Sequence, residues 1–296
     1  MTQVSLYQGS GFALGEFRCT PDDPRWRQEN DVGPLAVAAF PITSVVIRHV
    51  GHEAVLANAN HVVFYRGGDR YRRVLHDARG DHCLFVEFDV EAVAELLGSA
   101  GAAMRDLPFV HGPSLARQYL RLRVAARAAC SAEGEALAIE EAICDALSAA
   151  VEAGIKLHRV RRAMRAATVA EHARLVERAK HLLTERAAEH DSLTSLASRL
   201  HVSEFHLARA FRARTGFTLH RYRTHLRLRS ALDRLSRSPD DLTTVATELG
   251  FYSHSHFTGV FRSAFGASPS EVRATSGRRG LAELRRILEA PVVTSS

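Results

Sequence analysis

The fold is decided by a pattern that occurs twice near the C-terminus. It reads LASRLHVSEFHLARAFRARTG from Leu196 to Gly216 and VATELGFYSHSHFTGVFRSAFG from Val245 to Gly266. From Ser203 and Ser253 to the closing glycines, the two copies keep an offset of 50 residues. A repeat in which a short helix, a turn and a second helix follow one another predicts two helix-turn-helix units in one domain.

Both units carry end signals for their second helix. Ser203 and Ser253 are expected N-caps, because a serine oxygen can accept a hydrogen bond from an otherwise unpaired backbone N–H. Gly216 and Gly266 are expected to end these helices. Apolar residues at helical spacing predict the buried stripes, which are Leu207, Ala210 and Phe211 in the first unit and Phe257, Val260, Phe261 and Ala264 in the second.

One connecting helix is expected between the units, over residues 217–236. About 18 residues at a rise of about 1.5 Å span about 27 Å. Successive major-groove faces of DNA are about 34 Å apart. A helix of this length can therefore set such a separation, provided that the two units add their own width.

The repeat resembles the AraC/XylS family of transcription regulators. The resemblance is most specific in the closing segment, which contains GFYSHSHF from Gly250 to Phe257 and FGASPSEVR from Phe265 to Arg273. It covers about a third of the chain. It implies double-stranded promoter DNA as a partner, two recognition helices in successive major-groove segments, contact with RNA polymerase, and a cupin-like barrel that holds a small effector.

The resemblance also implies which side chains touch DNA. The expected base readers are Phe205, Ala208, Arg209, His254, Ser255 and His256. Arg209 is the strongest candidate, since a guanidinium can donate two hydrogen bonds to guanine. The expected phosphate contacts are Ser203, Arg212, Arg221, Arg223, Ser253 and Arg262. Gly259 stands where family members often carry a long polar side chain, so we expect the second unit to read fewer bases directly.

Charge favours the same interpretation. Residues 191–273 contain twelve arginines, seven acidic residues and no lysine, so twelve minus seven gives +5 within a chain of net charge +6. A positive balance confined to one domain is typical of phosphate binding.

The remaining composition indicates a two-domain intracellular protein. A chain of 296 residues with 46% hydrophobic residues can form two cores. No apolar run is long enough to span a membrane, and residues 1–10 lack a secretory signal. Four cysteines are too few for a disulfide scaffold. We therefore expect a cytoplasmic protein with reduced thiols.

The N-terminal part is expected to be rich in short strands. The candidates are residues 11–18, 35–40, 43–49, 54–56, 61–66, 71–75 and 83–89. Their spacing indicates a small barrel or a double sheet, and the family resemblance favours the cupin-like barrel. Arg48, Tyr65 and Arg66 are the candidate effector-binding residues; arginines here could equally be solvated strand edges.

The same predicted sheet contains potential metal-binding or redox-active side chains. The cysteines and histidines concerned are Cys19, His49, His52, His61, His76, His82 and Cys83. No pair among them has a CxxC or HxH spacing, and isolated cysteines in strands are usually small buried hydrophobes. The sequence therefore predicts no metal and no cofactor.

Two long helical patterns follow, over residues 115–130 and 135–165. By resemblance they pair two subunits in a homodimer; the alternative is that they pack on the chain's own sheet. The expected division is a β-rich effector or sensor domain in residues 1–112, a helical pair for dimerisation and linkage in 113–168, the DNA-binding domain in 169–275, and a basic hinge with a short tail helix in 276–296.

The sequence thus predicts an α+β protein with an N-terminal cupin-like barrel and a C-terminal all-α double helix-turn-helix domain. Its expected function is sequence-specific transcription regulation, more often activation, without enzymatic activity. Two alternatives stay open. One is a metal-dependent cupin enzyme fused to a DNA-binding domain, which would need a tight His/Glu motif. The other is an architectural DNA binder that is indifferent to sequence.

Overall fold

Two antiparallel sheets form the N-terminal part of the computed structural model, which describes residues 1–97, 104, 110–130, 136–162, 166–237, 241–275 and 280–289. The six-stranded sheet has the order β1-β2-β9-β4-β7-β10, and the four-stranded sheet has the order β3-β8-β5-β6. The strands are β1 (Thr2–Gln8), β2 (Phe12–Cys19), β3 (Asn30–Asp31), β4 (Ala36–Pro41), β5 (Val45–His49), β6 (Val55–Ala57), β7 (His61–Tyr65), β8 (Arg70–Leu75), β9 (Asp81–Phe88) and β10 (His111–Pro113).

The prediction of a closed barrel is wrong, because the strands form an open double sheet. Within the described residues, β1 pairs with β2 alone and β10 pairs with β7 alone, so the larger sheet ends at two edges. All seven predicted strands are present within one or two residues at each end. The sequence analysis missed β1, β3 and β10. Residue propensity predicts where strands lie. Closure of a barrel depends on whether the two edge strands can pair, and the alternation of apolar and polar residues along the chain does not encode that pairing.

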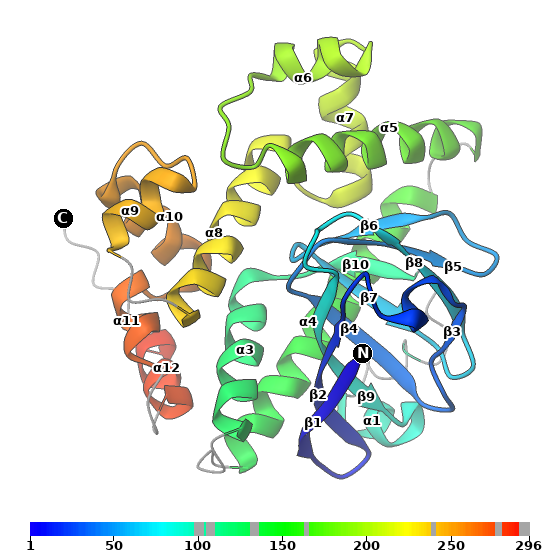
Figure 1. Ribbon diagram of the computed structural model, residues 1–296, viewed down its shortest axis with the longest axis vertical. Helices are drawn as coiled ribbons and strands as arrows, with labels where there is room; N and C mark the ends of the chain where they lie inside the picture. The colour runs from blue at the N-terminus through cyan, green and yellow to red at the C-terminus, as the bar shows by residue number, and fades with distance from the viewer. Residues whose placement is uncertain are drawn as a thin grey trace.

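Helices follow the sheets. They are α1 (Val90–Leu97), α3 (Ala116–Cys130), α4 (Ala136–Arg162), α5 (Ala166–Glu185), α6 (Leu193–Leu200), α7 (Glu204–Thr215), α8 (Leu219–Arg237), α9 (Leu242–Glu248), α10 (His254–Phe265), α11 (Pro269–Ala274) and α12 (Gly280–Glu289). Figure 1 shows the sheets on one side, the α3/α4 pair beside them, and the two helix-turn-helix units at opposite ends of α8. Of the predicted hinge over residues 276–280, residues 276–279 lie outside the described residues, as does the tail after 289, and Gly280 begins α12.

The helix pair α3/α4 packs within its own chain. α3 contacts α4, β1, α10 and α12. Its buried residues, which include Tyr119, Leu120 and Leu122, belong to one apolar core that runs from the sheet through α3 and α4 to α8, α9 and α10. The chain itself therefore covers most of the surface that the sequence analysis assigned to a dimer seam.

Helix α8 is buried in almost every direction, although it is rich in arginine. Besides the predicted apolar positions, it buries His225, Arg227 and Arg229. Arg229 donates to the carbonyl oxygens of Ala59 and Ser114 and to Ser114 Oγ, and its Cζ lies 4.5 Å from the ring centre of Tyr119. Burial lowers the pKa of Arg229 to about 10, so it stays charged at neutral pH. These bonds join α8 to the loop between β6 and β7 and to the start of α3.

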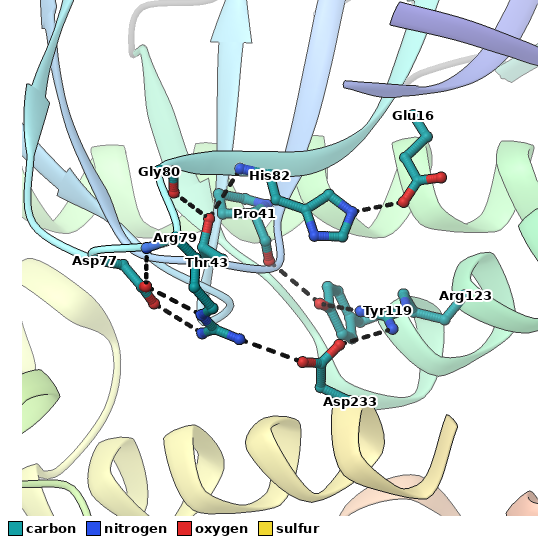
Figure 2. A network of polar contacts seen from close by, with 10 residues as sticks. All are labelled: Glu16, Pro41, Thr43, Asp77, Arg79, Gly80, His82, Tyr119, Arg123 and Asp233. Carbon is teal, nitrogen blue, oxygen red and sulfur yellow. Dashed lines mark hydrogen bonds and ion pairs between the residues drawn. The ribbon is translucent and has the colours of Figure 1, made fainter. Parts of the chain in front are cut away.

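A second polar contact fixes α8 from another side. Figure 2 shows Asp233 of α8 between Arg79, which precedes β9, and Arg123 of α3. The N···O separations are 3.5 Å in both pairs. Tyr119 donates to the carbonyl of Pro41 at 3.2 Å, so the same network reaches the six-stranded sheet.

Replacement of Arg229 by methionine should destabilise the protein. The change removes the hydrogen-bond donor of the buried carbonyls of Ala59 and Ser114. Each buried acceptor left unpaired lowers the free energy of unfolding by about 1–3 kcal/mol. Arg234→Ala is the matched control on the same helix, because its partner Glu248 is 55% exposed and surface pairs contribute about 0–1 kcal/mol. Urea unfolding measures both variants, and equal midpoints for the two would contradict a structural role for Arg229.

Candidate nucleic-acid interface

The two helix-turn-helix units are built as their sequences predict. In the first, α6 buries Leu196, Ala197 and Leu200 against α7 and α5. Ser203 caps α7 by accepting from His206 N at 3.2 Å. Gly216 ends α7 in the left-handed region, at φ +75°. The expected stripe of Leu207, Ala210 and Phe211 is fully buried.

The second unit repeats this construction. Ser253 caps α10 by accepting from His256 N at 3.1 Å, and Gly266 ends the helix at φ +83°. Phe257, Phe261 and Phe265 are fully buried. Val260 and Ala264, which were expected in the stripe, are only partly buried at its edge. The sequence analysis did not include Phe265 because it lies one residue beyond the predicted i+7 position.

Most of the predicted base readers lie on the surface. Phe205 is 76% exposed, and Arg209 is exposed with its Cζ 5.8 Å from the Phe205 ring centre. His254, Ser255 and His256 are all exposed at the start of α10. Ala208 differs, because it is half-buried and packs against the core of the first unit.

An exposed aromatic residue beside α10 was missed in the sequence analysis. Tyr252 precedes the N-cap, is 82% exposed, and lies 5.6 Å from the ring of His256 and 5.0 Å from the ring of His190. Its signal in the sequence was a tyrosine in the turn, where the first unit has Val202. A tyrosine suits an interface because it combines a large apolar ring with a hydroxyl group that can form hydrogen bonds.

The predicted phosphate contacts fall into two groups. Arg212 and Arg221 are exposed, and Ser203 and Ser253 lie at helix N-termini, where backbone N–H groups favour anions. The others are engaged by the chain itself. Arg223 donates to the carbonyl of Asp191 at 2.8 Å, and Arg262 forms an ion pair with Glu271 at 2.9 Å.

The charge count overstated the positive surface. Arg227 is buried and donates to the carbonyls of Ala187, Glu189 and Gly250, and burial lowers its pKa. Arg229 is buried as well. Neither guanidinium faces solvent, so two of the twelve arginines stabilise the fold rather than a surface field.

The expected effector residues do not come together. Tyr65 is buried and lines a cavity of about 130 Å³ between the two sheets. Arg48 lines a different, outer hollow near His49 and His52, and Arg66 is exposed in the turn after β7. The arginine that lines the cavity is Arg73. It is paired with Asp81 at 2.7 Å and also donates to Asn30 and Tyr71.

Comparison with known proteins supports the assignment of the C-terminal units. Residues 196–275 match the family described as a helix-turn-helix domain. Over 91 residues the chain is 38% identical to the HTH-type transcriptional activator RhaS of Escherichia fergusonii, a match that covers 31% of this chain and 33% of RhaS. Residues 196–275 therefore form a helix-turn-helix domain of the AraC type, which is found in transcription regulators. The chain spans about a third of the length of the curated relatives it matches.

Two solved structures are also similar to this chain. A transcriptional regulator of Chromobacterium violaceum with an AraC-type DNA-binding domain is 27% identical, with a TM-score of 0.34 over 36% of this chain and 96% of that one. Apo ToxT from Vibrio cholerae is 12% identical, with a TM-score of 0.36 over 90% of this chain and 98% of that one. No helix within the described ranges is long and apolar enough to cross a membrane.

Gly259→Ala should stabilise the protein by about 1 kcal/mol, the difference in helix propensity between the two residues. A Cβ at this position meets nothing within 4 Å. Gly250→Ala is the opposing control, because Gly250 has φ +77° and a Cβ there would lie 2.1 Å from the carbonyl oxygen of Ala188. In chemical unfolding, the denaturant concentration at the midpoint should rise for Gly259→Ala and fall for Gly250→Ala. A loss of stability in Gly259→Ala would mean that α10 packs more tightly than the structure indicates.

Proposed function

We propose that this chain is a sequence-specific DNA-binding transcription regulator that responds to a small molecule in its N-terminal double sheet. One observation carries the proposal. Two capped recognition helices, α7 and α10, sit at the two ends of one rigid helix and keep their N-terminal faces exposed. The 19 residues of α8 span about 28 Å, which suits two neighbouring major-groove segments.

The two helices divide the reading of bases unequally. Arg209 supplies a bidentate donor for guanine, and the exposed ring of Phe205 suits a thymine methyl group. In α10 the side chains that can donate hydrogen bonds to bases are His254, Ser255 and His256, all of which are shorter than Arg209, and Gly259 has no side chain. Tyr252 adds an exposed ring beside His256 and extends this surface. The first unit therefore supplies most of the direct discrimination between bases.

Phosphate contacts hold the protein in register. The N-termini of α7 and α10, capped by Ser203 and Ser253, present backbone N–H groups to the DNA backbone. Arg212 supplies exposed charge on the first unit, and Arg221 supplies it at the start of α8. Arg223 and Arg262 already use one nitrogen each for Asp191 and Glu271, so they have fewer donors left for phosphate than Arg212 and Arg221.

The cavity between the sheets is the proposed effector site. Apolar side chains such as Val45, Ile47 and Val63 form much of its wall, with the hydroxyl-bearing rings of Tyr65 and Tyr71. The charge of Arg73 is balanced by Asp81. This lining suits a small, neutral, mostly apolar molecule with one polar group.

Activation, contact with RNA polymerase and a homodimer complete the proposal by analogy. The matched part of RhaS belongs to a protein named as a transcriptional activator. For the homodimer, the described surface of the helix pair offers the exposed side chains of Leu115 and Leu137. Most of the pair's apolar surface packs inside the chain, so a dimer would use a small part of it.

Arg209→Ala should remove base preference in one half of the binding site. The loss of one bidentate contact costs about 1–3 kcal/mol of discrimination. Selection of bound genomic fragments at moderate salt, followed by sequencing, measures it for wild type and variant. Arg212→Ala is the control on the same helix, and it should weaken binding to all sequences alike. Retention that depends only on fragment length and salt would favour the architectural DNA binder.

Ala39→Phe should fill the cavity and abolish ligand-induced stabilisation. Ala39 lines the cavity and is 7% exposed. Thermal unfolding with a panel of small neutral aromatic compounds, such as phenol and indole, tests this, because a ligand that binds the folded state raises the melting temperature. Ala213→Phe, on α7 far along the chain from the sheets, controls for added bulk. No change in wild type across the panel would contradict the proposed ligand class.

A further inference from the structure

Three potential metal ligands from distant parts of the chain meet where the sheets contact α5. His76 directly follows β8, while His181 and Glu185 lie one helical turn apart on α5. One ligand atom from each residue lies within 4.8 Å of the others. The rings of His76 and His181 are 4.9 Å apart between centres. No other such group of three occurs within the described ranges.

His76 has a ring nitrogen that is available to bind a metal ion. The side chain of His76 is 9% exposed, and its Nε2 has no hydrogen-bond partner among the described residues. That atom lies 3.8 Å from Glu185 Oε1, which is too far for a hydrogen bond. An imidazole nitrogen without a hydrogen-bond partner is available to bind a metal ion.

We propose that His76, His181 and Glu185 bind a divalent transition-metal ion of the zinc type. Two nitrogens and one carboxylate oxygen are ligands that Zn²⁺ takes at about 2.0–2.2 Å, which places neighbouring ligand atoms about 3.3–3.6 Å apart. The 3.8 Å separation between His76 Nε2 and Glu185 Oε1 needs a closure of a few tenths of an ångström. All three ligand atoms lie within 4.8 Å of one another, so the exposed Glu185 and the His181 ring close on the ion by side-chain rotation. Ca²⁺ and Mg²⁺ prefer oxygen ligands and fit this set poorly.

The elements that carry the ligands are already held in place. Asp77, next to His76, is bound by Arg79, which also reaches Asp233 of α8 (Figure 2). On α5, Glu177 accepts from Leu56 N at 2.8 Å and from Lys180 at 2.9 Å. Rigid supports of this kind favour a defined coordination geometry.

A metal ion bound at this site connects the N-terminal sheets to the DNA-binding part. His76 belongs to the N-terminal sheets, and α5 packs directly on both α7 and α8 of the DNA-binding part. An ion held by both sides stabilises the docked arrangement and is absent from the unfolded chain. The site does not depend on the proposed effector or on the DNA sequence recognised.

The test is titration of the chelator-treated full chain with ZnCl₂ by calorimetry. We expect one equivalent to bind to wild type and the affinity to fall at least about tenfold in Glu185→Gln, since even outer-shell changes at metal sites cost about 10–100-fold. Glu185 is 58% exposed on its side chain, so the isosteric change leaves the fold intact; equal melting temperatures in chelator verify this.

The matched control is Glu171→Gln, on the same helix. Glu171 also lies near a histidine, with its Oε1 3.9 Å from His206 Nε2, and the change should leave zinc affinity unaltered. Zinc should also raise the melting temperature of wild type and of Glu171→Gln but not of Glu185→Gln or His181→Ala. Equal zinc affinity in wild type and Glu185→Gln, or no binding to wild type, would overturn the proposal.

Discussion

The burial of α8 is the constraint on which the arrangement of this protein depends. One helix links the two DNA-binding units and at the same time forms part of the core shared with the sheets. Charged side chains are costly to bury unless every donor finds a partner. Arg227 meets this condition, because each of its three nitrogens donates to a backbone carbonyl. Arg229 meets it at both terminal nitrogens, which donate to the carbonyls of Ala59 and Ser114, while its Nε has no partner among the described residues. The geometry between the units and the docking of the domains are therefore set by the same contacts.

A contiguous series of contacts joins the proposed effector cavity to that helix. Pro41 lines the cavity, and its carbonyl accepts from Tyr119. The ring of Tyr119 lies against Arg229, and Arg123, one turn along α3, reaches Asp233. A ligand that shifts the cavity wall thus acts on groups that touch α8 directly. Packed cores pass such shifts on because they have little free volume.

Arginines of the C-terminal part serve two separate purposes. Arg209 and Arg212 face outward on α7, where charge attracts DNA. Arg227 and Arg229 replace the hydrophobic side chains that a buried helix normally carries, and they bind loop carbonyls that no secondary structure satisfies. A charge count taken from composition gives all four arginines the same weight, because it does not record whether a side chain is exposed or buried. This is why the positive balance of the segment exceeds the charge available to DNA.

The sequence by itself determined the local structure. Caps at Ser203 and Ser253, stops at Gly216 and Gly266, and seven strands follow from interactions within a few residues, which a linear pattern records. Tertiary structure alone decided the rest. It paired the strands into an open double sheet, buried Arg229 against distant loops, and placed Arg73 rather than Arg48 beside the inner cavity. It also brought His76 together with His181 and Glu185, and all of these contacts join residues far apart in the chain. Such contacts depend on how whole elements pack, and no short-range spacing encodes that.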